Sequence, residues 1–406
     1  MITGAADDDP SGISTYSVAG ASAGYSMLWL TLISTPMMAV VQGMCARIAL
    51  VTGQGLAGVI RKRLPRPLVY LLVAIVVVAN TFNIGADIGG MGAAAHLLSP
   101  VPVVVWTVIF GVALIAAQIR FDYEQISRVF KWLTLTLFAY VVTAFVVHPP
   151  WATVLKHLAV PELHFDSGWL STMVGVLGTT ITPYLFFWQS SLMVEEEKAH
   201  GRTTLASRRG TDAQSVSDAH ADINAGMIYS NLVALFIIVT TAATLGAHGK
   251  HGIATAEQAA EALRPLAGNF AALLFTLGMI GTGILAVPVL ACSSAYVVSE
   301  TFRFREGLSQ RFMRAPQFYI VIIAGILIGI AIDLLRVDPI KALFWSAVLN
   351  GVAAVPLLAV IVWLASNKKI MGKWRSSVVA RAWGWGTVVL MTGACAGMFY
   401  FIARGQ

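Results

Sequence analysis

Long apolar stretches without regular polar alternation recur along the whole chain. Most extend over about 20 residues, the length that a helix needs to cross a bilayer, whereas barrel strands would alternate apolar and polar positions. The pattern predicts an all-α integral membrane protein with about eleven membrane-spanning helices. The expected spans are 1–21, 23–51, 66–97, 101–119, 124–147, 168–194, 219–246, 268–300, 316–335, 339–366 and 378–402.

Two of these spans, roughly half the chain apart, contain a proline beside residues that can hold a cation. The first contains Asp9-Pro10-Ser11-Gly12, and the second contains Gly178-Thr179-Thr180-Ile181-Thr182-Pro183-Tyr184. Proline removes a backbone donor and interrupts a helix. Broken helices at corresponding places in two halves of a chain indicate the midplane site of a transporter. We therefore expect helix breaks at 9–12 and near 182.

Composition and charge support a membrane location. Hydrophobic residues make up 57% of the chain and charged residues only 12%, against about 25% charged in a soluble domain. Alternate connections between the spans carry 20 of the 27 Lys and Arg residues, and the others carry six. This positive-inside pattern predicts a cytoplasmic N-terminus in a prokaryotic plasma membrane. The same distribution associates the net charge of +7 with the bilayer surface and argues against nucleic acid as a partner.

No linker divides the sequence, so we expect one transporter domain over 1–406. Cys45, Cys292 and Cys395 lie in apolar spans and are interpreted as buried small side chains. The longest hydrophilic stretch, Glu195–Asp222, is expected to be a solvated cytoplasmic loop. No cleavable signal peptide is visible, and the short segment before Asp9 favours further residues ahead of Met1. The oligomeric state is left open, and a monomer fits the sequence.

Asp9 is the strongest candidate ligand. A carboxylate inside a membrane costs several kcal/mol unless it is paired or hydrated, so it usually marks an ion path. Asp7 and Asp8 are interpreted instead as helix caps at a wet N-terminus. Ser11 and Gly12 would supply flexible backbone, whose carbonyl oxygens can complete the shell of a hard cation.

The second break offers hydroxyl oxygens. Thr179, Thr180 and Thr182 precede Pro183, although threonines in membrane helices often only bond back to the preceding turn. Gln189, on a later turn, could line an exit path. Carboxylate, carbonyl and hydroxyl oxygens suit Mg²⁺, Ca²⁺ and Mn²⁺, whereas sulfur favours later transition metals.

Further polar residues lie inside the spans. Asp87 is expected either to line a cation path or to pair with Arg47 or a backbone group, with Asn83 one turn away on the same face. Asn350 could reach the cavity. Asp333 and Glu300, near span ends, are interpreted as interfacial.

At these residues the sequence resembles the Nramp transporter superfamily over nearly its whole length. Asp9–Gly12 is similar to the family's first-helix Asp-Pro-Gly-Asn, Gly178–Ser190 to the sixth-helix stretch with Met-Pro-His, and Lys368–Gly372 to the close of the tenth helix. The resemblance implies a LeuT-type fold of two inverted five-helix repeats, about 1–147 and 168–366, followed by one extra helix at 378–402.

The departures from the family pattern point to one branch. The resemblance places the metal at Asp9, Gly12, Thr179 and Thr182, where Gly12 replaces the family's Asn and Thr182 its Met. Two family histidines linked to proton movement correspond to Tyr184 and Gln189. This set looks like the Nramp-related magnesium transporters, in which a wider pocket holds a partly hydrated ion.

Three functions follow as hypotheses. The first is transport of Mg²⁺, and also Mn²⁺, without tight proton coupling, because groups that titrate near neutral pH are missing from those two positions. The second is a proton-coupled Mn²⁺ or Fe²⁺ symporter. The third is a Nramp-like domain that signals without transport. No enzyme motif and no resident cofactor are expected, since the metal is the transported substrate.

Overall fold

Helices account for the regular structure of the residues described here. The computed structural model describes residues 8–120, 133–248, 253, 255–308, 310, 312–335 and 338–405. The longer helices are α2 (Pro10–Ala23), α3 (Leu28–Thr52), α5 (Arg66–His96), α6 (Val103–Arg120), α8 (Phe138–Val147), α10 (Ser167–Thr180), α11 (Pro183–Ala199), α13 (Ala213–Thr244), α16 (Ala271–Phe302), α17 (Pro316–Asp333), α18 (Pro339–Ser366) and α20 (Val378–Arg404).

Short helices fill several connections. They are α4 (Leu56–Arg63), α9 (Trp151–Ala159), α12 (Leu205–Arg208), α14 (Ala256–Glu261), α15 (Arg264–Ala267) and α19 (Lys368–Met371), with 3₁₀ turns η1 (Leu133–Leu137), η2 (Gly246–His248), η3 (Gly268–Phe270), η4 (Phe312–Arg314) and η5 (Gly372–Trp374).

Each expected span has a helical counterpart. Nine helical segments within the described ranges are long and apolar enough to cross a membrane, with α10 and α11 forming one of them. The other two are shorter: α2, with 14 residues, and the apolar stretch Leu135–Val147. The expected segments 1–7 and 124–132 lie outside the described residues.

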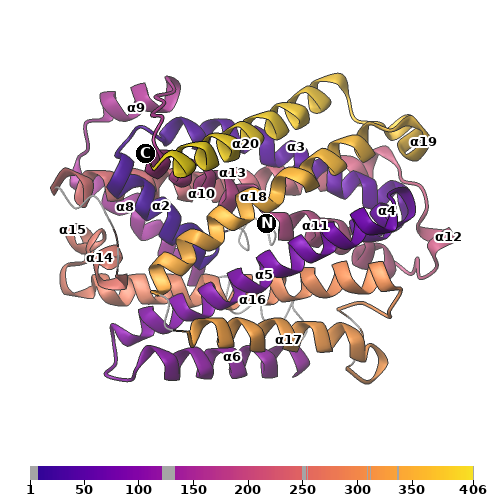
Figure 1. The fold of residues 1–406 in the computed structure, drawn as a ribbon, viewed down its shortest axis with the longest axis horizontal. Helices are drawn as coiled ribbons and strands as arrows, with labels where there is room; N and C mark the ends of the chain where they lie inside the picture. The colour runs from indigo at the N-terminus through magenta and orange to yellow at the C-terminus, as the bar shows by residue number, and fades with distance from the viewer. Residues whose placement is uncertain are drawn as a thin grey trace.

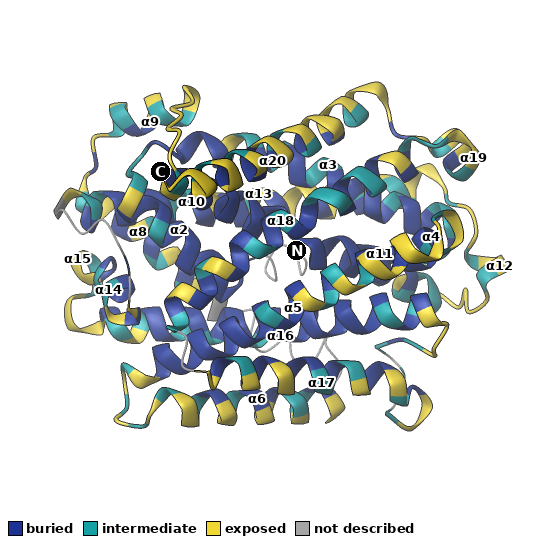
Figure 2. Cartoon of the chain, viewed as in Figure 1, coloured by how far each residue is buried: buried dark blue, intermediate teal, exposed yellow. Residues whose placement is uncertain are grey.

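The distribution of polarity is that of a protein in lipid. Large apolar side chains are exposed along the outer helices, for example Val112 of α6, Leu327 of α17 and Val389 of α20, and Figure 2 shows exposed residues along these helices. Polar groups are buried inside, including Asp9, Asp87 and Asn83. A soluble fold would leave few such apolar faces in water, so the bilayer is the solvent of this surface.

The connections divide between the two ends of the bundle. In Figure 1, α4, α12 and α19 lie at the right-hand end, and α9, α14 and α15 lie at the left-hand end. The right-hand end carries the lysine- and arginine-rich connections, including Arg61–Arg63. We call it the basic end.

The second helix break lies where it was expected. α10 ends at Thr180 and α11 begins at Pro183. Ile181 and Thr182 between them have non-helical backbone angles, with ψ of 65° and 138°. The proline supplies the reason, since it occupies the first position of α11 and donates no backbone hydrogen bond.

The first break differs from the expectation of unwound backbone at 9–12. Asp9 has extended backbone (φ −79°, ψ 169°), and α2 begins immediately at Pro10. Ser11 and Gly12 are therefore helical, because proline fits the first helical position and the Asp9 side chain caps the turn.

The hydrophilic stretch Glu195–Asp222 is also more ordered than the expected loop. α11 extends to Ala199, α12 occupies Leu205–Arg208, and α13 begins at Ala213. The Asp212 side chain caps α13 by accepting from the Ser215 backbone N–H at 2.8 Å. This capping extends the helix beyond its apolar part, which a hydropathy pattern does not reveal.

Close glycine packing fixes the helices around the second break. Gly178 of α10 crosses α18 so closely that a Cβ there would overlap the Ala347 carbonyl and the Gly351 backbone. Glycine is needed because the two backbones touch. The crossing brings the end of α10 beside Asn350, one residue before Gly351.

Candidate functional site

Asp9 is a buried carboxylate at the N-terminus of α2. Its side chain is fully buried, and its Oδ1 accepts hydrogen bonds from Ser11 Oγ and from the Gly12 backbone N–H, each at 2.7 Å. The partial positive charge of a helix N-terminus favours an anion at this place. Asp9 thus combines the capping role considered for its neighbours with the buried position expected of a ligand.

Asn83 of α5 links this carboxylate to two other helices. Asn83 Nδ2 donates to Asp9 Oδ2 at 3.1 Å and contacts Asp87 Oδ2 at 3.4 Å. Asn350 Nδ2 of α18 donates to Asn83 Oδ1 at 3.4 Å. One amide therefore positions both carboxylates from the centre of the bundle.

The two helix breaks lie against each other. A Cβ built on Gly12 would lie 3.1 Å from Thr179 Oγ1 and 3.4 Å from Asp9 Oδ1. The Tyr184 side chain on the first turn of α11 also hydrogen-bonds the Asp9 carboxylate. The space beside Gly12 is therefore bounded by Asp9 on one side and by the α10–α11 break on the other.

Several buried oxygen atoms around the breaks make no hydrogen bond within the described part of the chain. They are Thr179 Oγ1, Thr182 Oγ1, Asp87 Oδ1, Gln189 Oε1 and Asn350 Oδ1. A buried acceptor without a donor is costly. A cation or ordered water satisfies oxygen acceptors of this kind, so the pattern fits a site for a hard cation.

Two candidate residues are already engaged locally. Thr180 Oγ1 bonds back to the Val176 carbonyl at 3.0 Å, as threonines in membrane helices often do. Ser11 Oγ donates to Asp9 and so orients the carboxylate. Both lie near the breaks, but their hydroxyl hydrogens are committed to protein acceptors.

Of the alternatives considered for Asp87, the pairing with Arg47 is not found in the structure. The Arg47 guanidinium contacts His220 Nε2 at 2.7 Å and Ser376 Oγ at 3.5 Å. Asp87 is instead buried beside Asn83. Whether Asp87 faces Arg47 depends on the register of α5 relative to α3, which a single sequence does not provide.

Asp8 also differs from its interpretation as a cap at a wet N-terminus. Its side chain is buried and accepts from Ser230 Oγ of α13 at 2.9 Å. Asp7 lies outside the described residues. The sequence signal for this contact was Ser230, a polar residue in the middle of a long apolar helix.

The two carboxylates at span ends are held by protein groups. Asp333 accepts from Thr107 Oγ1 at 2.9 Å, and Glu300 accepts from the Gly58 backbone N–H at 2.7 Å. Sequence reasoning missed the central role of Asn83. The spacing of Asn80, Asn83 and Asp87 on one helical face was the signal that could have revealed it.

Within the described ranges, no three His, Cys, Asp or Glu side chains form a group that could hold a metal ion by themselves. The centre combines Asp9 and Asp87 with hydroxyl and amide oxygens. Few charged ligands and many neutral oxygens fit a divalent ion that keeps part of its water.

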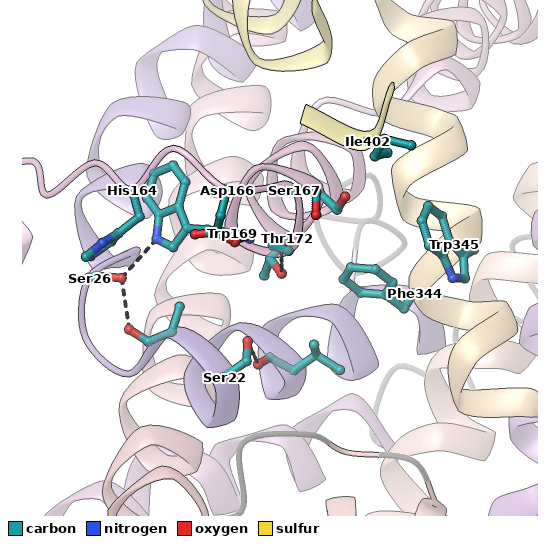
Figure 3. Close-up of a pocket in the computed structure, with 14 residues that line it drawn as sticks. Ser22, Ser26, His164, Asp166, Ser167, Trp169, Thr172, Phe344, Trp345 and Ile402 are labelled. Carbon is teal, nitrogen blue, oxygen red and sulfur yellow. Dashed lines mark hydrogen bonds between the residues drawn. The ribbon is translucent and has the colours of Figure 1, made fainter. Parts of the chain in front are cut away.

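A hollow of about 810 Å³ opens at the end of the bundle opposite the basic end, between α2, α10, α18 and α20. Figure 3 shows Trp169 Nε1 donating to Ser26 Oγ, a bond of 3.2 Å. Ser22 and Thr172 each bond back to their own helix, at 2.8 and 2.9 Å. These hydroxyl groups are therefore already satisfied within the protein and do not form a second set of free ligands.

Comparisons with known proteins give the same architecture. The family described as natural resistance-associated macrophage protein-like (Nramp) matches residues 1–401. A relative from Klebsiella pneumoniae, named divalent metal cation transporter MntH, is 29% identical over 391 residues, which cover 94% of this chain and 88% of the relative.

Solved structures share the fold. The Eremococcus coleocola manganese transporter, in complex with an aromatic bis-isothiourea substituted compound, superposes with a TM-score of 0.73 at 20% identity over 97% of this chain and 84% of that chain. MhsT in complex with L-phenylalanine gives 0.59 at 13% identity over 98% and 97%. These likenesses confirm the LeuT-type fold that the family resemblance implied. The family match over almost the whole length shows that this chain belongs to the Nramp family.

Proposed function

We propose that this protein transports divalent metal cations, with Mg²⁺ as the preferred substrate and Mn²⁺ also accepted. The observation that carries the proposal is the buried Asp9 facing a helix break with unpaired hydroxyl oxygens. Two relatives are named for divalent metal or manganese transport, which supports the substrate class.

The preference for Mg²⁺ rests on the donor atoms. Asp9, Thr179 and Thr182 offer oxygen, and Thr182 stands where the resemblance expects a sulfur ligand. Mg²⁺ loses its water reluctantly and needs only one or two carboxylates, so Gly12 would leave room for retained water. We therefore also propose that the chain belongs to the magnesium-transporting branch of the family.

Transport without tight proton coupling is the simplest mode. A divalent ion that crosses the full potential gains about 4.6 kcal/mol per 100 mV, which drives uptake without a second ion. The side chains at the two positions equated with family histidines are Tyr184 and Gln189, so a phenol and an amide stand in place of the two imidazoles.

Proton-coupled Mn²⁺ transport is the second candidate. The buried Asp87 carboxylate, joined to Asp9 through Asn83, favours it because a buried carboxylate can carry a proton. The two candidates differ in whether metal movement brings protons into the lumen.

The basic end is proposed to face the cytoplasm of a bacterial plasma membrane, following the positive-inside rule. The hollow lined by Trp169 would then be the outer approach.

The test is competitive uptake of Mg²⁺ and Mn²⁺ into proteoliposomes that contain a proton-sensitive dye. We expect both metals to enter, Mg²⁺ to compete effectively, and the lumen to keep its pH. An Asp9→Ala variant that folds should lose uptake of both metals. Metal-evoked acidification would favour the second candidate, and undiminished uptake by Asp9→Ala would remove Asp9 from the site.

A further inference from the structure

Three connections of the basic end meet at one corner of the molecule. α4 begins against the last turns of α16, where Glu300 Oε2 accepts from the Gly58 backbone N–H at 2.7 Å. The end of α12 is tied to the same place, because Arg208 Nε donates to the Gly53 carbonyl at 3.2 Å, just ahead of α4. In Figure 1, α4, the last turn of α16 and the first turn of α5 lie together at the right-hand end.

Cations from all three connections gather on this corner. They are Arg61, Lys62, Arg63, Arg209 and Arg303, and all except Arg61 are exposed. Partial desolvation lowers the pKa of Lys62, and the nearby charges of Arg209, Arg61 and Arg303 lower it further. In the part of the chain that the structure describes, none of the five forms an ion pair.

The carboxylates of this corner leave most of that charge uncompensated. Glu300 and Glu306 are the two whose charges act on Arg61. Both are half-buried, and Glu300 already accepts from the backbone of α4. The exposed cations have no carboxylate of their own, and like charges held close together favour the binding of an anion.

An exposed aromatic patch adjoins these cations. Tyr70 of α5 stacks on Phe302 of α16, with ring centroids 5.8 Å apart, and Phe302 stacks on Phe304 at 6.0 Å. All three rings are exposed, and the two phenylalanines flank Arg303 in the sequence. Aromatic rings of this kind lie at the level of the lipid headgroups. A soluble anion would make no use of them, whereas a lipid joins a charged head to an apolar tail.

We propose that this corner binds an anionic phospholipid of the leaflet at the basic end, with Lys62, Arg63 and Arg303 around the phosphate and with Tyr70 and Phe302 against the glycerol and the first part of the acyl chains. Guanidinium groups bind phosphate oxygens through paired hydrogen bonds. Basic clusters beside membrane helices bind anionic headgroups in the same way. The inference does not depend on which ion the protein transports.

The test is native mass spectrometry of the purified full chain with phosphatidylglycerol as the probe and phosphatidylcholine as the neutral comparison. Wild type should retain phosphatidylglycerol in preference to phosphatidylcholine. Combining Lys62→Gln, Arg63→Gln and Arg303→Gln should weaken phosphatidylglycerol binding by about tenfold or more, because each cation adds to the attraction. Lys62→Arg with Arg63→Lys and Arg303→Lys keeps the charge and should keep the binding.

The matched control removes the same charge elsewhere at the basic end. Lys368, Lys369 and Lys373 are exposed on α19 and η5, and replacing all three by Gln should leave the affinity as in wild type. Equal losses from the two triple variants would show a general attraction to net charge and overturn the site. Unchanged binding by the first triple variant, or displacement of the lipid by an equal concentration of inorganic phosphate, would also overturn it. Matching melting profiles would show that the variants are folded.

Discussion

At the scale of single residues, one amide holds the candidate centre together. Asn83 donates to Asp9 and to Asp87 and accepts from Asn350. Groups that orient a ligand affect metal affinity almost as strongly as the ligand does. This makes Asn83 a positioning residue that needs no contact with the ion.

Asn83→Leu should weaken metal binding by about 10- to 100-fold, the usual effect of removing a group that orients a ligand. Leucine has a similar volume but donates no hydrogen bond to Asp9. Mn²⁺ binding to purified protein is the measurement. Asn80→Leu is the control, because Asn80 bonds Ser294 Oγ at 2.9 Å instead of Asp9. Equal losses from both variants would argue for a general packing defect.

The preference between Mg²⁺ and Mn²⁺ should depend on Gly12 and Thr182, the two positions at which the ligand set departs from the family pattern. Thr182→Met together with Gly12→Asn should raise the affinity for Mn²⁺ relative to Mg²⁺, because a thioether favours the softer ion and the new side chain displaces water. A side chain at position 12 must also move Thr179 Oγ1 by a few tenths of an ångström, since the Cβ approaches it to 3.1 Å. Competition binding of the two metals measures the change. If the ratio of affinities stays at the wild-type value, the pocket has been placed wrongly.

At the scale of helices, glycine contacts set the distances that the centre depends on. The α10–α18 crossing at Gly178 leaves no room for a side chain. Overpacking in such a place commonly costs about 1–3 kcal/mol.

Gly178→Ala should therefore lower the melting temperature in detergent, despite the better helix propensity of alanine. Gly386→Ala on α20 is the matched control, because a Cβ there meets nothing within 4 Å. We expect the control to keep or raise the melting temperature. Equal effects of the two substitutions would contradict the close crossing.

The connection after α16 should respond to pH. Burial, with the neighbouring carboxylate of Glu300, raises the pKa of Glu306 to about 9. A raised folded-state pKa means that this residue's stabilising contribution is full below about pH 4.5 and is lost as pH rises toward 9. The melting temperature of wild type should fall between pH 6 and 9 more steeply than that of Glu306→Gln, which stays neutral. Parallel curves for the two proteins would refute the shift.

At the scale of the whole molecule, the proposed transport needs only the membrane potential. Uptake of Mg²⁺ into proteoliposomes should increase when the lumen is made negative by a potassium gradient with valinomycin. At 100 mV the limiting accumulation is about three decades, because each tenfold ratio corresponds to about 1.4 kcal/mol. Uptake that ignores the potential would exclude a mechanism in which the ion carries net charge across.

The sequence predicted the architecture well because hydropathy, proline and charge act locally. The spans and the break at Ile181–Thr182 required no knowledge of helix register, whereas the grouping of Asp9, Thr179 and Thr182 was implied by the family resemblance. The contacts of Asn83 and Asp8 depended on which helix faces which, and capping at Asp212 extended α13 into the expected loop. Those features depend on tertiary packing, which one sequence does not determine.

The interruption between α10 and α11 has a mechanical consequence. The last turn of α10 is clamped against α18 at Gly178, whereas no side chain of Thr182 caps the start of α11. We therefore expect any tilt between the two half-helices to occur about Ile181 and Thr182. Exposure of the ion to one side of the membrane would then require only one half to swing, while the clamped half keeps the ligands in register.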